Sequence, residues 1–320
     1  MMKNIGVLTS GGDAPGMNAA VRAVVRAAIH YGINVYGIEE GYYGLLNRKI
    51  RKLEYRDVSD IIAKGGTFLK SARCLEFATP EGVQKGVDVA REFGLDGLVV
   101  VGGDGSFRGA KDLSNAGLPT IGIPGTIDND IACTDYTLGF DTALRTACDA
   151  IDMLKDTCYS HGRCSVVEVM GRHAGHIALH AGIAGGGESI ILPEKDFDLT
   201  ETIEGIKHGL AMGKTHFVVV LAEGITNASQ VAKDIEAATG VETRATILGH
   251  TQRGGSPTVR DRVIATQMGV YAVELLMEGI SNCVVAYKSE KLVHYEINEA
   301  LAMKKSVDEN LVEVFKKVTY

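Results

Sequence analysis

The 320-residue sequence contains no tryptophan and only six prolines, and no part of it is low in complexity. No linker therefore marks a domain boundary, which must follow from the order of helices and strands. No apolar run approaches the roughly 20 residues that a membrane span requires. The opening residues, MMKNIGVLTS, lack the charged and then apolar pattern of a signal peptide. These absences predict a cytoplasmic protein without a membrane partner.

Basic residues are fewer than acidic residues. The chain carries 33 Lys and Arg against 40 Asp and Glu, a formal charge of −7. This balance argues against general attraction to nucleic acid or to an anionic membrane, although a local arginine pocket still suits a phosphate group. The six cysteines form no CxxC pair, so we expect reduced thiols. With 45% hydrophobic residues, the chain can build one large domain or two ordinary ones.

Several common catalytic motifs are missing. There is no GxxxxGK[ST], and the glycines at 103, 105 and 109 miss the GxGxxG spacing by one residue. No GxSxG motif is present for acyl transfer. His173, His176 and His180 fall at i, i+3 and i+7 of a predicted helix, but without HExxH or cysteine partners they make a poor metal site.

Short β-prone runs alternate with helical periods along most of the chain. Residues 5–10, 17–32 and 33–38 read as strand, helix and strand, which is one βαβ unit. Further strands are predicted at 96–103, 119–126, 165–170, 189–193, 215–224 and 243–249. Further helices are predicted near 107–115, 141–159, 173–184, 199–212, 228–238 and 260–279. The alternation predicts an α/β fold whose parallel sheets are covered on both faces.

Glycine-rich segments follow the predicted strands. In chain order they read TSGGDAPG, GGDGS, GTIDND, VMGRHAGH, AEG and GHTQRGG. Ligands of α/β proteins bind beyond the carboxyl ends of strands, where glycine lets backbone N–H groups approach an anion. Tight strand-to-helix turns need glycine for structural reasons as well. Six such loops together favour phosphate binding, and phosphoryl transfer is the reaction class that remains.

Two of these loops, GGDGS and GTIDND, carry candidate catalytic aspartates. A carboxylate beside a cradled polyphosphate requires a divalent cation between them, so Asp104 is a candidate Mg²⁺ ligand; the alternative is that it caps a helix beginning near Ser106. Asp128 and Asp130 lie two residues apart, so one can hold metal while the other accepts a proton. The alternative for this pair is ordinary Asx-turn chemistry.

Five arginines fall at or near the loops, and guanidinium groups bind phosphate with two parallel hydrogen bonds. They are Arg73, Arg163, Arg172, Arg244 and Arg253. Any one of them can instead be a solvated surface residue. Arg172 and Arg253 are the better candidates because glycines flank them or share their loops.

Taken together, the segments GVLTSGGDAPGMNAAVR, GGTFLKSAR, VVGGDGS, PGTIDNDI, VEVMGRHAG, AEG and LGHTQRGGSPT resemble the bacterial ATP-dependent 6-phosphofructokinase family over nearly the whole chain. The resemblance implies two Rossmann-like three-layer αβα domains with mainly parallel sheets. It further implies an ATP-binding domain of residues 1–138 plus 255–305, and a fructose 6-phosphate-binding domain of residues 139–254 plus 306–320.

The implied reaction is Mg²⁺-dependent transfer of the ATP γ-phosphoryl group to the 1-hydroxyl of fructose 6-phosphate, in glycolysis. By motif position, Asp128 is the base, Thr126 and Arg172 meet the transferred group, and Gly12 lets the backbone approach it. ATP is contacted by Gly12, Arg73, Gly103, Asp104, Gly105 and Ser106. Mg²⁺ is held by Asp104, with Asp130 as a second candidate ligand.

The resemblance also assigns the sugar phosphate site. Its implied members are Thr126, Asp128, Arg163, Met170, Gly171, Arg172, Glu223, Arg244, His250 and Arg253. Arg163 and Arg244 reach across a subunit interface in the family, which implies a homotetramer with shared active sites. Gly105 and Gly125 stand where pyrophosphate-dependent relatives carry an acidic residue and a lysine, so the resemblance favours ATP.

The family's effector pocket for ADP and the inhibitor phosphoenolpyruvate is matched less well. Its implied members here are Arg22, Arg26, Lys155, Gly186, Glu188 and Lys214. Tyr55, Lys155, Met212 and Thr215 depart from the family's usual, commonly basic residues, so we expect weakened effector binding.

Other functions fit less well. An NAD or lipid kinase shares the GGDG loop but should lack the MGR and HTQRGG segments, and a silent nucleotide sensor has no need of Asp128. A dehydrogenase requires GxGxxG and an acidic partner for the ribose.

Overall fold

The computed structural model describes residues 2–319, which form two compact units. Unit 1 contains the chain up to Ile127, Ile131–Thr142 and Arg253–Lys305. Unit 2 contains Asp128–Asp130, Ala143–Gln252 and the chain from Ser306 onward. The binding of ATP by one unit and of sugar phosphate by the other stays a prediction.

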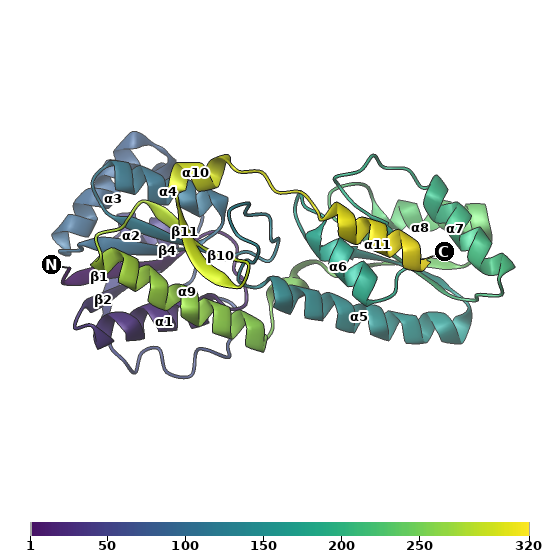
Figure 1. The fold of residues 1–320 in the computed structure, drawn as a ribbon, viewed down its shortest axis with the longest axis horizontal. Coiled ribbons are helices and arrows are strands. Elements are labelled where there is room, and N and C mark those ends of the chain that lie inside the picture. Colours follow the sequence, from purple (N-terminus) through teal and green to yellow (C-terminus); the bar gives the residue numbers. More distant parts are fainter. Residues whose placement is uncertain (1, 320) are drawn as a thin grey trace. The chain divides into compact units, whose positions relative to one another are not determined.

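Unit 1 is built on a seven-stranded sheet with the order β11-β10-β5-β4-β1-β2-β3 (Figure 1). Its neighbours pair in parallel except at the two edges, where β3 and β11 run antiparallel to β2 and β10. The central strands are buried and rich in β-branched residues, as expected for a sheet covered on both faces. The strands are β1 (Asn4–Thr9), β2 (Asn34–Ile38), β3 (Ile50–Leu53), β4 (Gly97–Gly102), β5 (Thr120–Pro124), β10 (Cys283–Lys288) and β11 (Lys291–Glu296).

Helices cover both faces of this sheet. Figure 1 shows α1 (Met17–His30) and α9 (Val259–Met277) side by side on one face. The other face carries α2 (Gly41–Leu46), α3 (Pro80–Glu92), α4 (Asp104–Asn115) and α10 (Ile297–Ala302), with the short helix η1 (Glu76–Ala78) beside them. Buried aromatic and aliphatic side chains, Tyr42, Phe77, Phe107 and Leu113 among them, form the core on that side.

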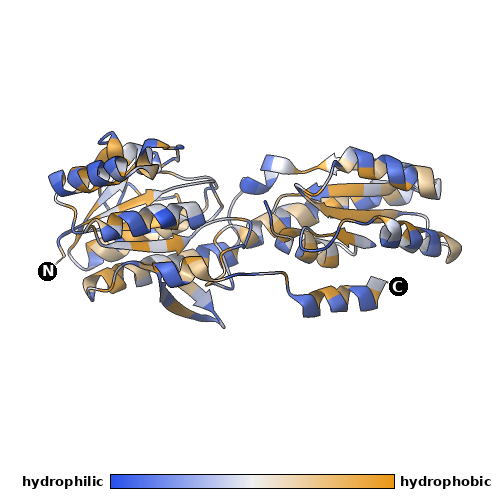
Figure 2. Cartoon of the chain, turned by 90° about the horizontal axis from the view of Figure 1, so that it is seen from above, coloured by the Kyte–Doolittle hydropathy of each residue, from blue (hydrophilic) through white to orange (hydrophobic). Residues whose placement is uncertain are grey.

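Unit 2 has a four-stranded, fully parallel sheet with the order β7-β8-β6-β9. Its strands are β6 (Cys164–Val169), β7 (Ser189–Ile191), β8 (Phe217–Ala222) and β9 (Thr243–Ile247). The helices are α5 (Phe140–His161), α6 (His176–Ala184), α7 (Thr200–Ala211), α8 (Ala228–Thr239), η2 (Gly249–Arg253) and α11 (Glu309–Thr319). The strands of both sheets are mostly apolar in Figure 2, which accords with sheets buried between helices.

The predicted α/β class with mainly parallel sheets is confirmed. Two helix starts were wrong. The helix predicted from 173 begins at His176, because Gly171 and Arg172 have positive φ angles of 152° and 61° that interrupt helical backbone. His173 therefore lies outside the helix, and the predicted i, i+3, i+7 histidine face does not exist. The helix predicted from about 107 begins at Asp104.

Elements in two regions were not predicted. Between residues 39 and 95 these are α2, β3, η1 and α3, and beyond residue 280 they are β10, β11, α10 and α11. Within residues 2–319, no helix combines the length and apolarity that crossing a membrane requires. All six cysteines are free thiols, and burial raises the pKa of Cys133 to about 11 and that of Cys164 to about 12.

Candidate active site

Three of the glycine-rich loops begin side by side at the edge of the unit 1 sheet where the parallel strands have their carboxyl ends. In the paired strands Thr9 lies opposite Val101, and Gly102 lies opposite Pro124. Hydrogen bonds extend this pairing beyond the strands, from Ser10 N to Val101 O at 2.9 Å and from Gly125 N to Gly102 O at 2.9 Å. The loops after β1, β4 and β5 therefore share one edge, as parallel pairing requires.

The loop after β4 leaves its backbone open. A Cβ atom on Gly102 would lie 2.5 Å from Ser10 O, so this position needs glycine for close packing. At Gly103 and Gly105, by contrast, no heavy atom lies within 4 Å of the Cβ position. These two glycines leave room beside the start of α4, where N–H groups and the helix dipole favour an anion.

Asp104 is the first residue of α4, and Gly103 precedes it as the N-cap without a side-chain hydrogen bond. The alternative that Asp104 caps a helix beginning near Ser106 is therefore wrong. Ser106 itself is buried in the first turn, and its carbonyl accepts a hydrogen bond from the Tyr42 hydroxyl.

The structure brings Arg253 against the loop after β1. A Cβ atom on Gly12 would lie 2.6 Å from Arg253 Nη1, and the same nitrogen donates to Asp13 O at 3.2 Å. Two residues from distant motifs, SGGD and TQRGG, thus meet in unit 1. The guanidinium lies beside a glycine backbone, a combination suited to a phosphate. Arg73, also predicted near ATP, lies exposed in the loop that precedes η1.

Thr126, Asp128 and Asp130 follow β5. Asp128 is only 5% exposed, whereas Thr126 and Asp130 are half-buried. Asn129 between the two aspartates has φ 50°, in the left-handed region that asparagine tolerates. Asp128 and Asp130 are grouped with unit 2, so their position relative to Asp104 stays a prediction.

In unit 2, the loop after β6 carries Met170, Gly171 and Arg172. Glu223 Oε1 accepts hydrogen bonds from the N–H groups of Gly171 at 3.1 Å and Arg172 at 2.7 Å. Met170 N donates to Gln252 Oε1 at 2.8 Å. Side chains from two other strand ends therefore hold this loop.

Gln252 was missed by the sequence analysis, although it lies inside the GHTQRGG segment. It is fully buried, at 0% exposure, which is unusual for a glutamine. Burial is the feature that marks this residue, and the sequence does not reveal it. Its neighbour His250 lies exposed in η2, and the sequence gives no way to tell the two apart.

Arg163 and Arg244 meet at one carboxylate. Arg163 Nε donates to Glu242 Oε2 at 2.8 Å, and Arg244 Nη2 donates to Glu242 Oε1 at 2.6 Å. Hydrogen bonds from these arginines hold the pKa of Glu242 below its ordinary value. The Arg244 side chain is 72% exposed, so its remaining donors face solvent. Glu242, which organises the pair, was not predicted.

The metal prediction rests on two carboxylates. Among residues 2–319, no group of three His, Cys, Asp or Glu side chains is placed to hold a metal ion. Mg²⁺ is usually bound by one or two carboxylates together with water and substrate phosphates, so the oxygens of Asp104 and Asp130 fit its chemistry without such a cluster.

The predicted effector residues fall into two groups. In unit 1, Arg22 and Arg26 lie on α1, and the Arg26 guanidinium lies 4.2 Å from the centre of the Tyr55 ring. In unit 2, Lys155 Nζ donates to Gly185 O at 2.8 Å, next to Gly186. The buried Glu188 accepts from Lys214 and from Val218 N.

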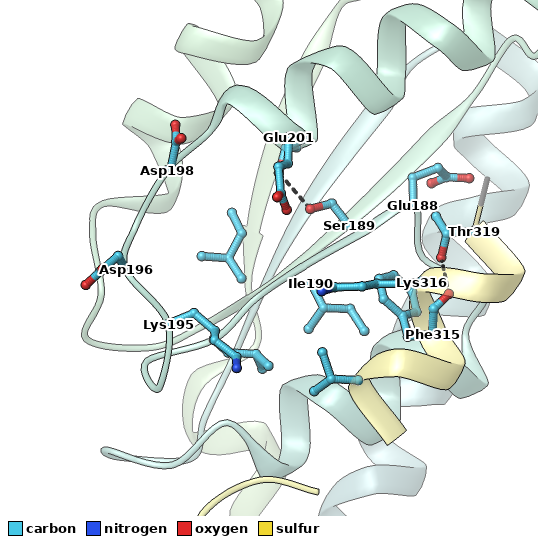
Figure 3. A pocket seen from close by; sticks show the side chains of 14 residues that line it. Glu188, Ser189, Ile190, Lys195, Asp196, Asp198, Glu201, Phe315, Lys316 and Thr319 are labelled. Atoms are coloured by element: carbon cyan, nitrogen blue, oxygen red, sulfur yellow. Dashed lines mark hydrogen bonds between the residues drawn. The ribbon is translucent and has the colours of Figure 1, made fainter. Parts of the chain in front are cut away.

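A cavity of about 450 Å³ lies in unit 2 between the segment after β7 and helix α11 (Figure 3). Ile190 and Phe315 line it together with Lys195, Lys316 and several acidic side chains. Lys195 bridges the two walls through an ion pair with Glu309 at 2.8 Å. Of the residues predicted from the sequence, only Glu188 lines this cavity, so it is not the predicted catalytic site.

Comparison with known proteins shows which family the chain belongs to. The family profile described as Phosphofructokinase matches residues 4–276. The chain belongs to the phosphofructokinase family. The resemblance seen in the motifs is thereby confirmed.

Phosphofructokinases from several bacteria align over the full length. A protein of Clostridium tetani named ATP-dependent 6-phosphofructokinase is 57% identical over 319 residues, covering all of both chains. A protein of Bacillus subtilis with the same name is 55% identical over 318 residues, covering 99% of this chain and all of the relative.

Solved phosphofructokinase structures share the fold. The structure of phosphofructokinase from Saccharomyces cerevisiae matches with a TM-score of 0.90 and 34% identity, covering 99% of this chain and 50% of that one. A pyrophosphate-dependent phosphofructokinase from Marinobacter aquaeolei matches with a TM-score of 0.87 at 22% identity, a likeness of fold alone.

Proposed function

We propose that this phosphofructokinase is ATP-dependent and transfers the γ-phosphoryl group of ATP to the 1-hydroxyl of fructose 6-phosphate. The products are ADP and fructose 1,6-bisphosphate, and the reaction belongs to glycolysis. The observation that carries the proposal is the shared edge of the loops after β1, β4 and β5, where open glycines, Asp104 and Thr126 follow adjacent strands. The names of the full-length relatives support ATP as the donor.

Phosphoryl transfer depends on in-line positioning and on cations placed against the charge that spreads over the transferred group. In the proposed site Asp128 accepts the proton of the sugar hydroxyl, while Thr126 and Arg172 bind the transferred group. The glycine backbone at Gly12 lets that group come close. When bound, Mg²⁺ supplies charge neutralisation for the phosphates, with Asp104 and then Asp130 as its protein ligands.

The nucleotide is proposed to bind along the open start of α4. Gly103 and Gly105 present N–H groups to its phosphates at the turn that also contains Ser106, and Arg73 adds positive charge. The free space at Gly105 is what a nucleotide α-phosphate requires.

The sugar phosphate is proposed to bind to the loop held by Glu223 and Gln252. Met170, Gly171, Glu223, His250 and Arg253 line it, and Arg163 and Arg244 bind the phosphate of a neighbouring subunit's substrate. This sharing requires a homotetramer. The exposed Arg244 and its partner Arg163, oriented by one carboxylate, suit such a role.

Regulation by ADP and phosphoenolpyruvate is proposed to be weak. The Tyr55 ring stacks against the Arg26 guanidinium, and Met212 is an exposed side chain that carries no charge. Fewer cations at the pocket mean less attraction for a polyanionic effector.

The role of Asp128 is tested by Asp128→Asn, which keeps the shape of the side chain and removes the proton acceptor. We expect kcat to fall by about 10²- to 10⁴-fold, the usual contribution of a placed general base. The exposed Asp88 on α3 offers a matched control, since Asp88→Asn removes the same charge at a distance from the loops. A fall in kcat of less than tenfold, with the control unchanged, would remove Asp128 from this role.

A further inference from the structure

Asp261, on α9, is a fully buried carboxylate with 0% exposure. Among the ion pairs of residues 2–319 it takes part in none, so hydrogen bonds must compensate for the loss of water. Burial raises the pKa of this carboxyl group, and the hydrogen bonds it accepts act in the opposite direction. Buried charge is costly, so its presence calls for a reason.

The Asp261 carboxylate accepts four hydrogen bonds from one segment, residues 136–142, which lies 119 to 125 positions earlier in the chain. Oδ1 accepts from the Tyr136 hydroxyl at 2.6 Å and from Gly139 N at 2.7 Å. Oδ2 accepts from Thr142 N at 3.0 Å and from the Thr142 hydroxyl. One carboxylate therefore fixes both ends and the middle of this segment.

The segment in turn is paired with the loop that carries Thr126. Leu138 N donates to Pro124 O at 2.9 Å, and Leu138 forms a β-bridge with Gly125. The Thr137 hydroxyl donates to Thr126 O at 2.6 Å. Residues 137 and 138 thus hold the end of β5 and the loop after it up to Thr126, two residues before Asp128.

The same segment contacts the loop after β1. Gly139 has φ 102°, and a Cβ atom there would lie 2.7 Å from Ala14 Cβ and 3.2 Å from Ile127 Cγ2. Asp261 Cβ also lies 3.5 Å from the Cβ position of Gly16. Residues 136–142 are therefore wedged between two of the glycine-rich loops, and Asp261 lies behind them.

We propose that Asp261 is a positioning residue: it fixes residues 136–142 and, through them, sets the loop that carries Thr126 and leads into Asp128. The inference rests on the proposed function, since it assigns those two residues to phosphoryl transfer. Asp261 itself touches no predicted ligand group. Its effect on catalysis is transmitted through the backbone at positions 124–126.

The test is Asp261→Asn in the full-length enzyme. An amide of the same shape keeps one acceptor oxygen, but its NH2 group faces one backbone N–H, whose hydrogen bond is lost, and one hydroxyl, which must turn to accept instead of donate. A misplacement of about 1 Å can cost about 10²-fold in rate. We expect kcat to fall about 10- to 100-fold, while the KM values for ATP and fructose 6-phosphate change by less than about threefold.

A second pair of variants covers the case in which Asp261→Asn does not fold. Thr142→Val removes one hydroxyl donor to Asp261, whereas Thr142→Ser keeps it. We expect kcat to fall in the valine variant and to be largely restored in the serine variant. This rescue separates loss of the hydrogen bond from simple disturbance of packing.

The matched control is Thr258→Ala. Thr258 is the N-cap of the same helix, and its hydroxyl accepts from Asp261 N at 3.3 Å. Its backbone N–H donates to the Thr142 hydroxyl at 3.0 Å, a hydrogen bond that Thr258→Ala keeps. It should lower the melting temperature and leave kcat unchanged. Circular dichroism at the assay temperature shows whether each variant is folded.

The proposal is overturned if folded Asp261→Asn keeps the kcat of the unmodified enzyme, or if both Thr142 variants lose kcat equally. It is also overturned if Thr258→Ala lowers kcat as strongly as Asp261→Asn, since destabilisation alone then explains the effect. If the unmodified enzyme fails to phosphorylate fructose 6-phosphate, the proposed function has failed instead.

Discussion

In the proposed function, single residues decide which phosphate donor the site accepts, and Gly105 is the clearest example. It is exposed in the first turn of α4, and the space around its Cβ position is open. A side chain there meets no protein atom, so the fold itself does not require glycine. The requirement comes from the ligand in the proposed function.

The prediction at this position uses the pair Gly105→Asp and Gly105→Asn, which differ in charge and hardly in size. A carboxylate beside the nucleotide phosphates repels them, whereas an amide only occupies space. We expect the aspartate variant to raise the KM for ATP at least about tenfold above that of the asparagine variant, about 1.4 kcal/mol. Initial rates at saturating fructose 6-phosphate measure this. Equal KM values in the two variants would mean that no phosphate binds there.

At the residue scale, the sequence offers candidates where a motif follows a strand, and it offers none where a partner comes from a distant segment. The glycines and aspartates at 103–105 and 126–130 are readable because they follow strands. The sequence does not point to Gln252, Glu242 and Asp261. Their respective partners are Met170, two arginines and residues 136–142, which only folding brings near. The roles of the site residues stay predictions.

Among the elements, helices α1 and α9 show how closely packing constrains sequence. A Cβ atom on Gly269 of α9 would lie 2.6 Å from Ala23 Cβ and 2.8 Å from Ala20 O of α1. The second contact is to backbone, which cannot move aside as a flexible side chain does. Glycine at this position therefore permits the close approach of the two helices.

Gly269→Ala tests this contact, because the substitution improves helix propensity and at the same time crowds the helix interface. Alanine improves helix propensity by up to about 1 kcal/mol, but overpacking costs about 1–3 kcal/mol. Because the clash involves backbone, we expect net destabilisation, seen as a lower melting temperature. Gln267→Ala, at an exposed position of the same helix, should change stability by less than about 0.5 kcal/mol. An unchanged or higher melting temperature for Gly269→Ala would refute close packing here.

Elements with strong periodicity were predicted well, and boundaries set by special backbone angles were not. The buried strands β1, β4, β5 and β8 are continuous apolar runs, which the sequence displays directly. The start of α6 was wrong because Gly171 and Arg172 adopt positive φ angles that residue types alone do not reveal. Helix α3 begins with Thr79 as N-cap and Pro80 in its first turn, signals that were present and not used.

The whole molecule consists of two α/β units, each with its own sheet, and the chain passes between them several times. The proposed residues are divided accordingly. The open glycines and Asp104 belong to unit 1, while Met170, Arg172 and Glu223 belong to unit 2. The proposed phosphoryl transfer needs residues of both units, so it is a property of the complete chain. The proposed roles of Arg163 and Arg244 further require the tetramer.

The measurement that tests this account most directly is product formation by the purified full-length protein from fructose 6-phosphate. ATP or pyrophosphate serves as the donor, with Mg²⁺ present or removed by a chelator. We predict fructose 1,6-bisphosphate and ADP in equal amounts with ATP and Mg²⁺, and none after chelation until Mg²⁺ is restored. Turnover with pyrophosphate alone, or no phosphorylation of fructose 6-phosphate under any of these conditions, would contradict the account.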